Sequence, residues 1–440
     1  MLRSMYSGVS GLKAHMDKMD VVSNNISNVN TVGYKGSRAT FKTMFSQMIQ
    51  GASAPQGGRG GTNPQQIGLG ATLGSIDKDM GQGSLKSTGR NQDLAIEGSG
   101  FFVVSDGISQ LYTKSGTLAK DKSGFLVNST TGYRVKGWQA DANGNINTNG
   151  QLEDLTLKQT MPAEATTEVN YAGNLDAAAA NGDQWNTSFE AYDSQGGLHT
   201  VDLQFSKNSA NTWDYQVTHI EDSQGDVEYD FANDTHSADV SNSMGQIDFT
   251  SSGEFAGAAS GDITAPNTDL DTGNDQLNLE FNPQYDNDGA ASPVSIDLDF
   301  SSMTQNYNEM TADRDTVNGY SAGSLIDYNF DNTGTITGEY DNGKRQTIGQ
   351  IALADFNNPG GLASEGNTMF RVSNNSGEPK ISTAASGGLG TIKAGSLEMS
   401  NVDLSRQFTE MITTQRGFQA NSKTISTSDQ ILQELVNLKR

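Results

Sequence analysis

The residues best suited to covalent chemistry in this sequence are Ser321 and its neighbours. Residues 319–323, GYSAG, match the G-x-S-x-G pattern that holds a serine nucleophile on a sharp turn between a strand and a helix. That arrangement needs a catalytic histidine after the serine in the chain. The four histidines all precede it: His15, His199, His219 and His236. A serine hydrolase is therefore not expected.

A second stretch resembles a phosphate-binding loop. Residues 338–344, GEYDNGK, have the glycine and lysine spacing of that loop. Arg345, however, stands where the loop has the serine or threonine that binds magnesium, and the DNG at 341–343 is typical of a hairpin turn. We therefore expect no enzymatic activity and no cofactor.

Two stretches rich in Asp and Asn resemble the start of a calcium-binding loop. They are Asp141-x-Asn143-x-Asn145 and Asp286-x-Asp288. Neither continues to a glutamate at the twelfth position, which would supply two oxygen ligands. Because Asn, Asp and Gly are also the residues that tight turns require, we expect ordinary turns and no metal site.

Composition excludes several further classes of protein and of binding site. The chain has 440 residues, enough for two or three domains, and no cysteine, so disulfides and thiolate metal sites are excluded. No apolar run approaches the roughly 18 residues of a membrane-spanning helix, so no membrane insertion is expected. The first 20 residues lack the apolar core of a secretory signal, so any export is expected to occur without a cleaved signal peptide.

The net charge of −24 is concentrated in one segment. Residues 151–320 contain 31 of the 52 acidic residues but only 3 of the 28 Lys and Arg. This asymmetry predicts a separately folded acidic insert within a nearly neutral framework. Nucleic acid is not an expected partner, because its phosphates would be repelled by such a surface.

Both ends of the chain show the 3-4 apolar spacing of a coiled-coil helix. Near the N-terminus the spacing is carried by Leu2, Met5, Val9, Leu12, Met16, Met19 and Ile26. Near the C-terminus it is carried by Leu404, Phe408, Met411, Phe418, Ile425, Leu432 and Val436. We call these two sets the apolar stripes. They predict one helix at each end of the chain, and we expect the two helices to lie against each other along the stripes.

Between the helices the sequence predicts β structure. Turn signals such as DKSG at 121–124 and DNTG at 331–334 separate short runs with strand-like alternation, for example residues 201–205. Residues 51–74 have almost no apolar periodicity, which indicates a long loop or an extended arm. The expected fold is mainly β with α-helical termini, and its β domains are expected to be antiparallel sandwiches or barrels.

Four segments resemble the bacterial flagellar rod and hook proteins. DVVSNNISNVNTVGYKGSRATF at 20–41 resembles that family's N-terminal signature, a helix followed by an asparagine-rich turn and Gly-Tyr-Lys. The segment 400–435 resembles its C-terminal helix, and 90–104 with 132–138 resemble its β core. The long insert, together with YDNGKRQTIGQIALADFNNPGGL at 340–362, favours the hook branch of the family over the rod branch.

The resemblance implies a structural subunit that polymerises with many copies of itself into a hollow, bendable tube, which passes torque from the rod to the filament. The terminal helices would form a coiled-coil-like inner layer, with the β domains outside. The implied partners are the flagellar rod, hook cap and hook-filament junction proteins. Export would run through the flagellar type III apparatus to an extracellular position in the hook.

The asparagine-rich stretch would be a joint between the two layers, and with the arm it would contact neighbouring subunits. Its candidate interface residues are Asn24, Asn25, Asn28, Asn30, Gly33 and Tyr34. The expected division is an N-terminal helix at 1–30, joint and arm at 31–74, a β core at 75–150 and 321–395, an acidic outer domain at 151–320, and a C-terminal helix at 396–440.

Two alternatives stay open. One is a distal rod protein of the same family, which would form a stiff shaft, although the large insert argues against it. The other is an acidic, turn-rich surface adhesin or calcium-binding β protein, which would leave the apolar stripes unexplained.

Overall fold

The computed structural model describes residues 2–55, 57–58, 60–223, 227–230, 240–241, 243–260, 276–281 and 293–437. The chain forms two compact units. Unit 1 comprises Met1–Leu157, Tyr328–Gly338 and Gln346–Arg440, and unit 2 comprises Lys158–Asp327 and Glu339–Arg345. Three strands each contain a boundary between the units: β25 (Gly323–Phe330), β26 (Thr335–Tyr340) and β27 (Arg345–Ile351).

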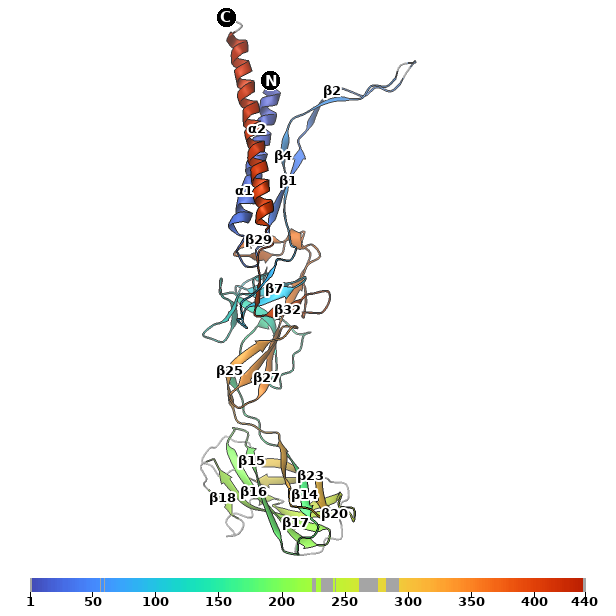
Figure 1. Ribbon diagram of the computed structural model, residues 1–440, viewed down its shortest axis with the longest axis vertical. Helices are drawn as coiled ribbons and strands as arrows, with labels where there is room; N and C mark the ends of the chain where they lie inside the picture. Colours follow the sequence, from blue (N-terminus) through green and yellow to red (C-terminus); the bar gives the residue numbers. More distant parts are fainter. Residues whose placement is uncertain are drawn as a thin grey trace. The chain divides into compact units, whose positions relative to one another are not determined.

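The helices of unit 1 come from the two ends of the chain and lie side by side (Figure 1). They are α1 (Leu2–Ser27) and α2 (Leu404–Asn437). Asp403 caps α2, because its Oδ1 accepts hydrogen bonds from the backbone N–H groups of Ser405 at 2.8 Å and Arg406 at 3.2 Å. The prediction of a helix at each end is confirmed. Within the described residues, neither helix combines the length and apolarity needed to cross a membrane.

An extended arm leaves unit 1 beside the helices (Figure 1). It consists of two antiparallel ribbons, β1 (Ser37–Thr43) with β4 (Ala71–Lys78), and β2 (Ser46–Gln50) with β3 (Gln65–Gly68). The first ribbon packs against α1. The stretch without apolar periodicity is therefore part of an arm, and the arm is longer than the sequence indicated.

The rest of unit 1 is a β core around an aromatic cluster. Phe101 lies edge-on to Phe356 and Phe370, and Tyr112 packs on Phe356 at 4.8 Å between ring centroids. Its strands are β5 (Leu85–Ser87), β6 (Leu94–Glu97), β7 (Phe101–Ser105), β8 (Gln110–Thr113), β9 (Leu118–Lys120), β10 (Leu126–Asn128), β11 (Arg134–Gln139), β12 (Glu153–Asp154), β27 (Arg345–Ile351), β28 (Leu353–Asp355), β29 (Ala363–Gly366), β30 (Met369–Arg371), β31 (Lys380–Ser382), β32 (Thr391–Ala394) and β33 (Ser396–Glu398). Every residue of β7 is buried, which explains why its sequence is a continuous apolar run.

Unit 2 is a β sandwich. One sheet has the order β15-β16-β17-β20-β21, with β18 also on β17, and the other has the order β19-β22-β23-β14-β24. Their strands are β14 (Glu168–Asp176), β15 (Gln184–Tyr192), β16 (Leu198–Ser209), β17 (Thr212–Asp222), β18 (Val227–Asp230), β19 (Val240–Ser241), β20 (Met244–Phe249), β21 (Phe255–Ser260), β22 (Gln276–Phe281), β23 (Val294–Asn306) and β24 (Asp313–Val317), and the short β13 (Thr160–Met161) pairs with β25. Tyr171 and Phe300 of one sheet pack on Phe205 of the other at 5.9 Å, so the core lies between the sheets.

One detail of unit 2 differs from the expected antiparallel pattern. Strands β14 and β23 pair in parallel, from Glu168 opposite Asp297 to Asp176 opposite Asn306. A parallel pair needs a long crossover connection. Here the chain between the two strands includes all the strands of the other sheet, so the sandwich itself supplies the crossover.

The Asp-x-x-Gly signals form turns of one kind. In DANG at 141–144, Oδ1 of Asp141 accepts hydrogen bonds from the backbone N–H groups of Asn143 at 2.9 Å and Asn145 at 2.8 Å. Asp121, Asp193 and Asp331 bond in the same way to the residues two and four positions later. A carboxylate that accepts two backbone bonds holds a turn without a metal.

Candidate assembly interface

The two helices pair along a line of mostly small and polar side chains, which we call the pairing seam. The contacting pairs are Ser4 with Ser428, Gly8 with Ile425, Gly11 with Asn421, His15 with Gly417, Lys18 with Glu410 and Asn25 with Gln407. Residue numbers rise along α1 as they fall along α2, so the helices are antiparallel. On α1 these positions follow the alternating spacing of a coiled coil.

The pairing seam lies one residue away from the apolar stripes. Each stripe residue of α1 from Met5 to Ile26 directly follows a seam residue, and the same holds for Phe408, Met411 and Phe418 of α2. One residue corresponds to about 100° around a helix. The expectation that the stripes face each other is therefore wrong, with Ile425 as the exception. Small seam residues allow a close backbone approach that large apolar residues would prevent.

The stripes are consequently only partly covered within one chain. Val9 and Met16 are 51% and 47% exposed, and Phe408 is 50% exposed. Leu404 and Val436 are also exposed, and the half-buried members are Met5, Leu12, Met19, Ile26, Met411, Phe418, Ile425 and Leu432. The side chain of Leu2 lies outside the described residues. Exposed apolar side chains grouped on a helix in this way are typical of a protein contact.

The glycines of the seam set the distance between the helices. A Cβ atom on Gly417 would lie 2.6 Å from Cε1 and Nε2 of the His15 ring, and one on Gly11 would lie 2.9 Å from Nδ2 of Asn421. Real Cβ atoms do not approach other heavy atoms so closely. These glycines weaken the isolated helices, but they are needed for this packing.

We expect Gly417→Ala to weaken the helix pair. Alanine favours a helix by about 1 kcal/mol over glycine, but overpacking against His15 costs about 1–3 kcal/mol. Hydrogen exchange of α1 and α2, read by mass spectrometry, should therefore be faster. The double variant Gly417→Ala with His15→Ala removes the clash and should recover protection. Slower exchange in the single variant would contradict the close packing.

Asn25 connects three elements at the predicted joint. Its side chain is 1% exposed, and its Nδ2 donates to the backbone oxygen of Ser37 at 2.7 Å and to Oε1 of Gln407 at 3.1 Å. Its Oδ1 accepts from the Ser37 N–H at 2.9 Å and lies 3.2 Å from the Tyr34 hydroxyl. Asn25 thus holds the end of α1, the start of β1 and the first turns of α2 together. Its burial is a structural role within one chain, in addition to any contact between subunits.

The other joint residues shape the turn that leaves α1. Nδ2 of Asn28 donates to the backbone oxygen of Asn24 at 2.9 Å, and Oδ1 of Asn24 accepts from the Tyr34 hydroxyl at 2.7 Å. Gly33 has φ +71°, and a Cβ there would lie 2.7 Å from the backbone nitrogen of Ser115, so only glycine fits. Asn30 is exposed. The structure therefore brings together Asn24, Asn25, Asn28 and Tyr34 but not Asn30.

A buried group of charges lies next to this turn, and sequence reasoning missed it. Lys35 Nζ donates to Oε1 of Glu398 at 2.7 Å and to the backbone oxygen of Gly81 at 2.8 Å. Lys114 Nζ lies 3.9 Å from the second carboxylate oxygen of Glu398, and the side chains of Lys35 and Glu398 are fully buried. Burial lowers the pKa of Lys114 to about 8, although the Glu398 carboxylate opposes this shift. The Glu398 carboxylate, at the end of β33, thus lies between Lys35, which precedes β1, and Lys114, which directly follows β8.

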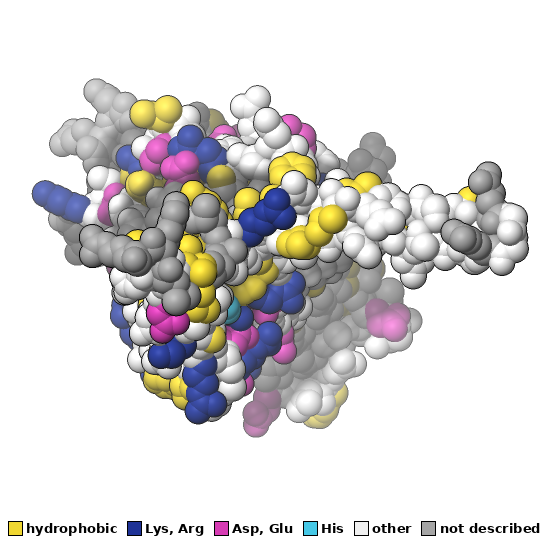
Figure 2. Space-filling view, turned by 90° about the horizontal axis from the view of Figure 1, so that it is seen from above, with side chains coloured by type: hydrophobic (Ala, Val, Ile, Leu, Met, Phe, Trp, Pro, Cys, Tyr) yellow, Lys and Arg dark blue, Asp and Glu magenta, His cyan; other side chains and the backbone are white. Residues whose placement is uncertain are grey.

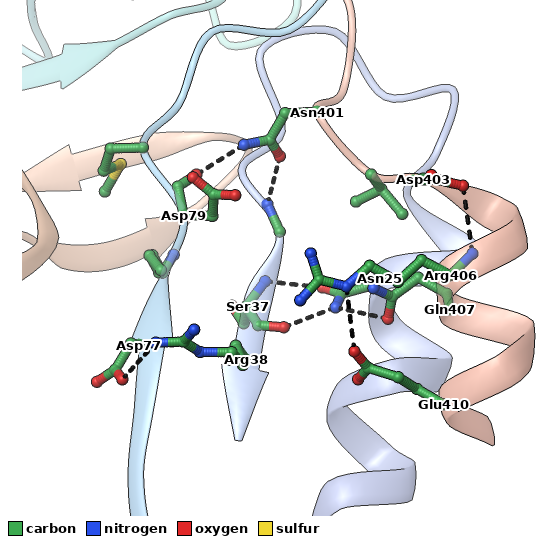
Figure 3. Close-up of a pocket in the computed structure, with 14 residues that line it drawn as sticks. Asn25, Ser37, Arg38, Asp77, Asp79, Asn401, Asp403, Arg406, Gln407 and Glu410 are labelled. Atoms are coloured by element: carbon green, nitrogen blue, oxygen red, sulfur yellow. Dashed lines mark hydrogen bonds and ion pairs between the residues drawn. The ribbon is translucent and has the colours of Figure 1, made fainter. Parts of the chain in front are cut away.

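A polar pocket of about 380 Å³ lies where α1, α2, β1 and β4 meet (Figure 3). Four of its charged side chains form two pairs, Arg38 with Asp77 at 3.8 Å and Arg406 with Glu410 at 3.3 Å. Asn401 donates to the backbone oxygen of Asp79 at 2.8 Å. These internal pairs make the pocket a polar junction of four elements.

The arm presents uncharged surface. Between Lys42 and Asp77 the sequence has one charged residue, Arg59, and the described atoms of the projecting arm are mostly white in Figure 2, the colour of backbone and of side chains that are neither charged nor hydrophobic. Exposed apolar side chains follow the arm nearer its base, including Phe45 at 86%. A two-stranded ribbon is marginally stable alone in water, so this arm needs further packing.

The two motifs considered for catalysis have ordinary structural roles. Residues 319–323 run directly into strand β25 and not into a helix, and Asp341-Asn342-Gly343 forms the hairpin turn between β26 and β27. No group of three His, Asp or Glu side chains among the described residues could hold a metal ion. Asp286 and Asp288 lie outside the described residues.

Family models match four parts of the chain. They are described as "Flagella basal body rod protein" at residues 5–35, "Flagellar hook protein FlgE/F/G D1 domain" at 95–173, "Flagellar basal body protein FlaE D2 domain" at 156–320 and "Flagellar basal body rod FlgEFG protein C-terminal" at 393–438.

Several curated proteins are similar over the whole chain. The flagellar hook proteins FlgE of Treponema pallidum and Borreliella burgdorferi are 39% and 40% identical to it, each with 100% of both chains covered. FlgE of Escherichia coli is 32% identical over 98% of both chains. Among solved structures, Helicobacter pylori flagellar hook protein FlgE2 has a TM-score of 0.48 at 14% identity, covering 71% of this chain and 100% of that one.

Proposed function

The chain belongs to the flagellar hook protein family, and we propose that it builds the hook by burying its exposed apolar stripes between neighbouring copies. Members of this family are structural, non-enzymatic subunits of the hook in the flagellar basal body, and they assemble with copies of themselves. The full-length similarity is to hook proteins, which favours the hook over the distal rod and over an adhesin.

The observation that carries this proposal is the one-residue offset between the pairing seam and the stripes. The seam uses small and polar residues to pair α1 with α2 inside one chain. The stripes are left with exposed members such as Met16 and Phe408. Burying an apolar side chain of this size contributes about 1.5–3 kcal/mol, so a repeated contact between copies would be strongly stabilised.

The exposed apolar face is wider than the stripes alone. Ile412, Ile431 and Leu435 on α2 are 51%, 42% and 48% exposed and lie outside the strict 3-4 spacing. The broader helical spacing of i, i+3 and i+4, rather than one coiled-coil seam, would have found them. We assign them to the same contact between copies.

In the assembled tube the helix pairs form the inner layer and the β domains the outer one. The arm, with its exposed Phe45 and nearly uncharged surface, packs on a neighbouring copy together with the joint residues Asn30 and Tyr34. The acidic outer domain keeps its contacts wet and weak, so neighbouring copies slide as the tube bends and transmits torque.

The remaining partners and the location follow from this role. The tube joins the flagellar rod at one end and the hook-filament junction proteins at the other, and it grows beneath a hook cap protein. The chain reaches its extracellular position through the flagellar type III export apparatus, without a cleaved signal peptide.

Electron microscopy of the purified protein after assembly tests the proposed function. We expect curved, hollow tubes from the full chain, and none from a chain that lacks residues 1–30 and 400–440, because both stripes are then removed. Straight rods would support the distal-rod alternative. Tubes from the shortened chain would show that the helices do not hold the polymer together.

We also expect unit 2 to fold on its own. Its sandwich core, with Trp213 and Tyr171 fully buried, is made from residues of Lys158–Asp327, the main segment of the unit. A fragment of that range should therefore be soluble and melt in one cooperative transition by circular dichroism. An aggregated or unfolded fragment would show that the proposed outer domain is not an independent insert.

A further inference from the structure

His15 lies where three elements of unit 1 meet. Its ring packs against Gly417 of α2, where a Cβ atom would be 2.6 Å away, and lies edge-on to Phe41 of β1 with 5.4 Å between ring centroids. It is therefore in contact with both the second helix and the base of the arm. It is also the single histidine in the sequence of unit 1, since His199, His219 and His236 fall in the range of unit 2.

The surroundings of the ring favour the neutral form. Nδ1 of His15 is buried and has no hydrogen-bond partner in the described part of the chain. Burial lowers the pKa of His15, and the Lys18 ammonium lowers it further. A protonated ring here would be a second cation beside Lys18, with one N–H group facing no acceptor.

The elements around His15 offer little charge to stabilise a protonated ring. On α1 the charged residues within three positions of His15 are Lys13, Asp17 and Lys18, and Lys18 already pairs with Glu410 of α2 at 3.8 Å. Arg416 of α2 and Lys42 of β1 are the next charges along those elements, and both add positive charge. Strand β4 has no charged residue before Asp77. Of these groups, Lys18 acts on the ring directly and disfavours an imidazolium.

We propose that His15 is an acid-sensitive latch: the neutral ring closes the junction of α1, α2 and the arm, and its protonation opens that junction. Opening separates the helix pair that positions the apolar stripes. If the stripes hold the polymer together, as the proposed function states, opening of the junction should shorten assembled tubes in mild acid. The latch itself is a property of one chain and can be measured without assembly.

The direction of the pH effect on the closed junction follows from the pKa of His15 in the closed and in the opened form. In the opened helices the ring regains its ordinary pKa of about 6.5, which is higher than in the closed junction. The opened form therefore binds more protons as the pH falls through this range. Stability of the closed junction is complete above the ordinary pKa and is lost progressively below it.

Hydrogen exchange of the full-length monomer, read by mass spectrometry at about pH 7.5 and about pH 5, tests the latch. After correction for the intrinsic pH dependence of exchange, peptides from α1, α2 and β1 should exchange several-fold faster in acid. His15→Phe keeps a flat ring but cannot be protonated, so protection of these peptides should become independent of pH. His15→Gln provides a second neutral side chain if the larger ring disturbs the packing.

Two further variants separate the latch from general acid effects. Lys18→Met removes the neighbouring cation and should reduce the acid response. His219→Gln changes a histidine of unit 2 that pairs with Glu221 at 2.9 Å, and the response of α1 and α2 should remain. An equal acid response in both His15 variants, or none in the unaltered chain, would overturn the proposal. Failure of tubes to shorten while the monomer opens would contradict the assembly mechanism and not the latch.

Discussion

Aspartate at Met16 and Phe408 is expected to abolish tube formation while the monomer keeps its fold. Both side chains are about half exposed in the single chain, so the folded monomer loses little when they change. In the polymer each aspartate would have to be buried without a partner, which costs several kcal/mol at every copy. Sedimentation and electron microscopy should show monomers only, with a melting temperature close to that of the unaltered chain.

Ala420→Asp is the matched control for this prediction. Ala420 is exposed on α2 and lies about 120° around the helix from Phe408, and no residue three or four positions from it has an apolar side chain that could belong to the stripe. A new carboxylate there should leave assembly intact, because it remains in water. If the control also prevented assembly, the effect would be due to added negative charge on α2 and not to the apolar stripe.

Glu398→Ala is expected to lower the free energy of unfolding of unit 1 by about 3–5 kcal/mol. The substitution leaves Lys35 and Lys114 buried without the carboxylate that lies between them. Scanning calorimetry should show the transition of unit 1 at a much lower temperature, with that of unit 2 unchanged. Replacing Lys35 and Glu398 together by Met and Leu should restore part of the loss, because one buried charge and its partner are then both absent.

The exposed ion pair of Arg371 with Glu365 provides the comparison. Its atoms lie 2.9 Å apart, compared with 2.7 Å between Lys35 and Glu398, but both side chains are at least one third exposed. Because water and salt screen such a pair, Glu365→Ala should cost less than about 1 kcal/mol. If Glu398→Ala and Glu365→Ala lowered the free energy of unfolding by the same amount, the burial of Glu398 would not contribute to its effect on stability.

The sequence could predict those features that depend on the spacing of residues close together in the chain. The helix at each end follows from the 3-4 spacing of residues such as Val9 and Leu12, and alternation along residues 201–205 predicts a strand with one buried face. The turns follow from Asp and Gly at fixed offsets, as Asp141 shows. In each case the residues that decide the structure are within a few positions of one another.

What sequence could not predict depends on partners far away in the chain. An apolar stripe indicates which residues must be buried. It does not indicate whether they are buried by another segment of the same chain or by another copy. The one-residue offset between the pairing seam and the stripes was therefore missed. Lys35 and Glu398 are 363 positions apart, and neither has a local pattern that identifies its partner. The parallel pairing of β14 with β23 is likewise a matter of topology and has no local signal.

The antiparallel pairing of α1 with α2 also affects the order in which parts of the chain can fold. Ser4 meets Ser428 across 424 positions of the chain, so α1 cannot close its seam until nearly the last residue is available. Closing so large a loop is slow and costs chain entropy, whereas the sandwich core of unit 2 is complete within one continuous stretch. We therefore expect the two helices to pair late in folding, and a chain interrupted before α2 has no seam to close.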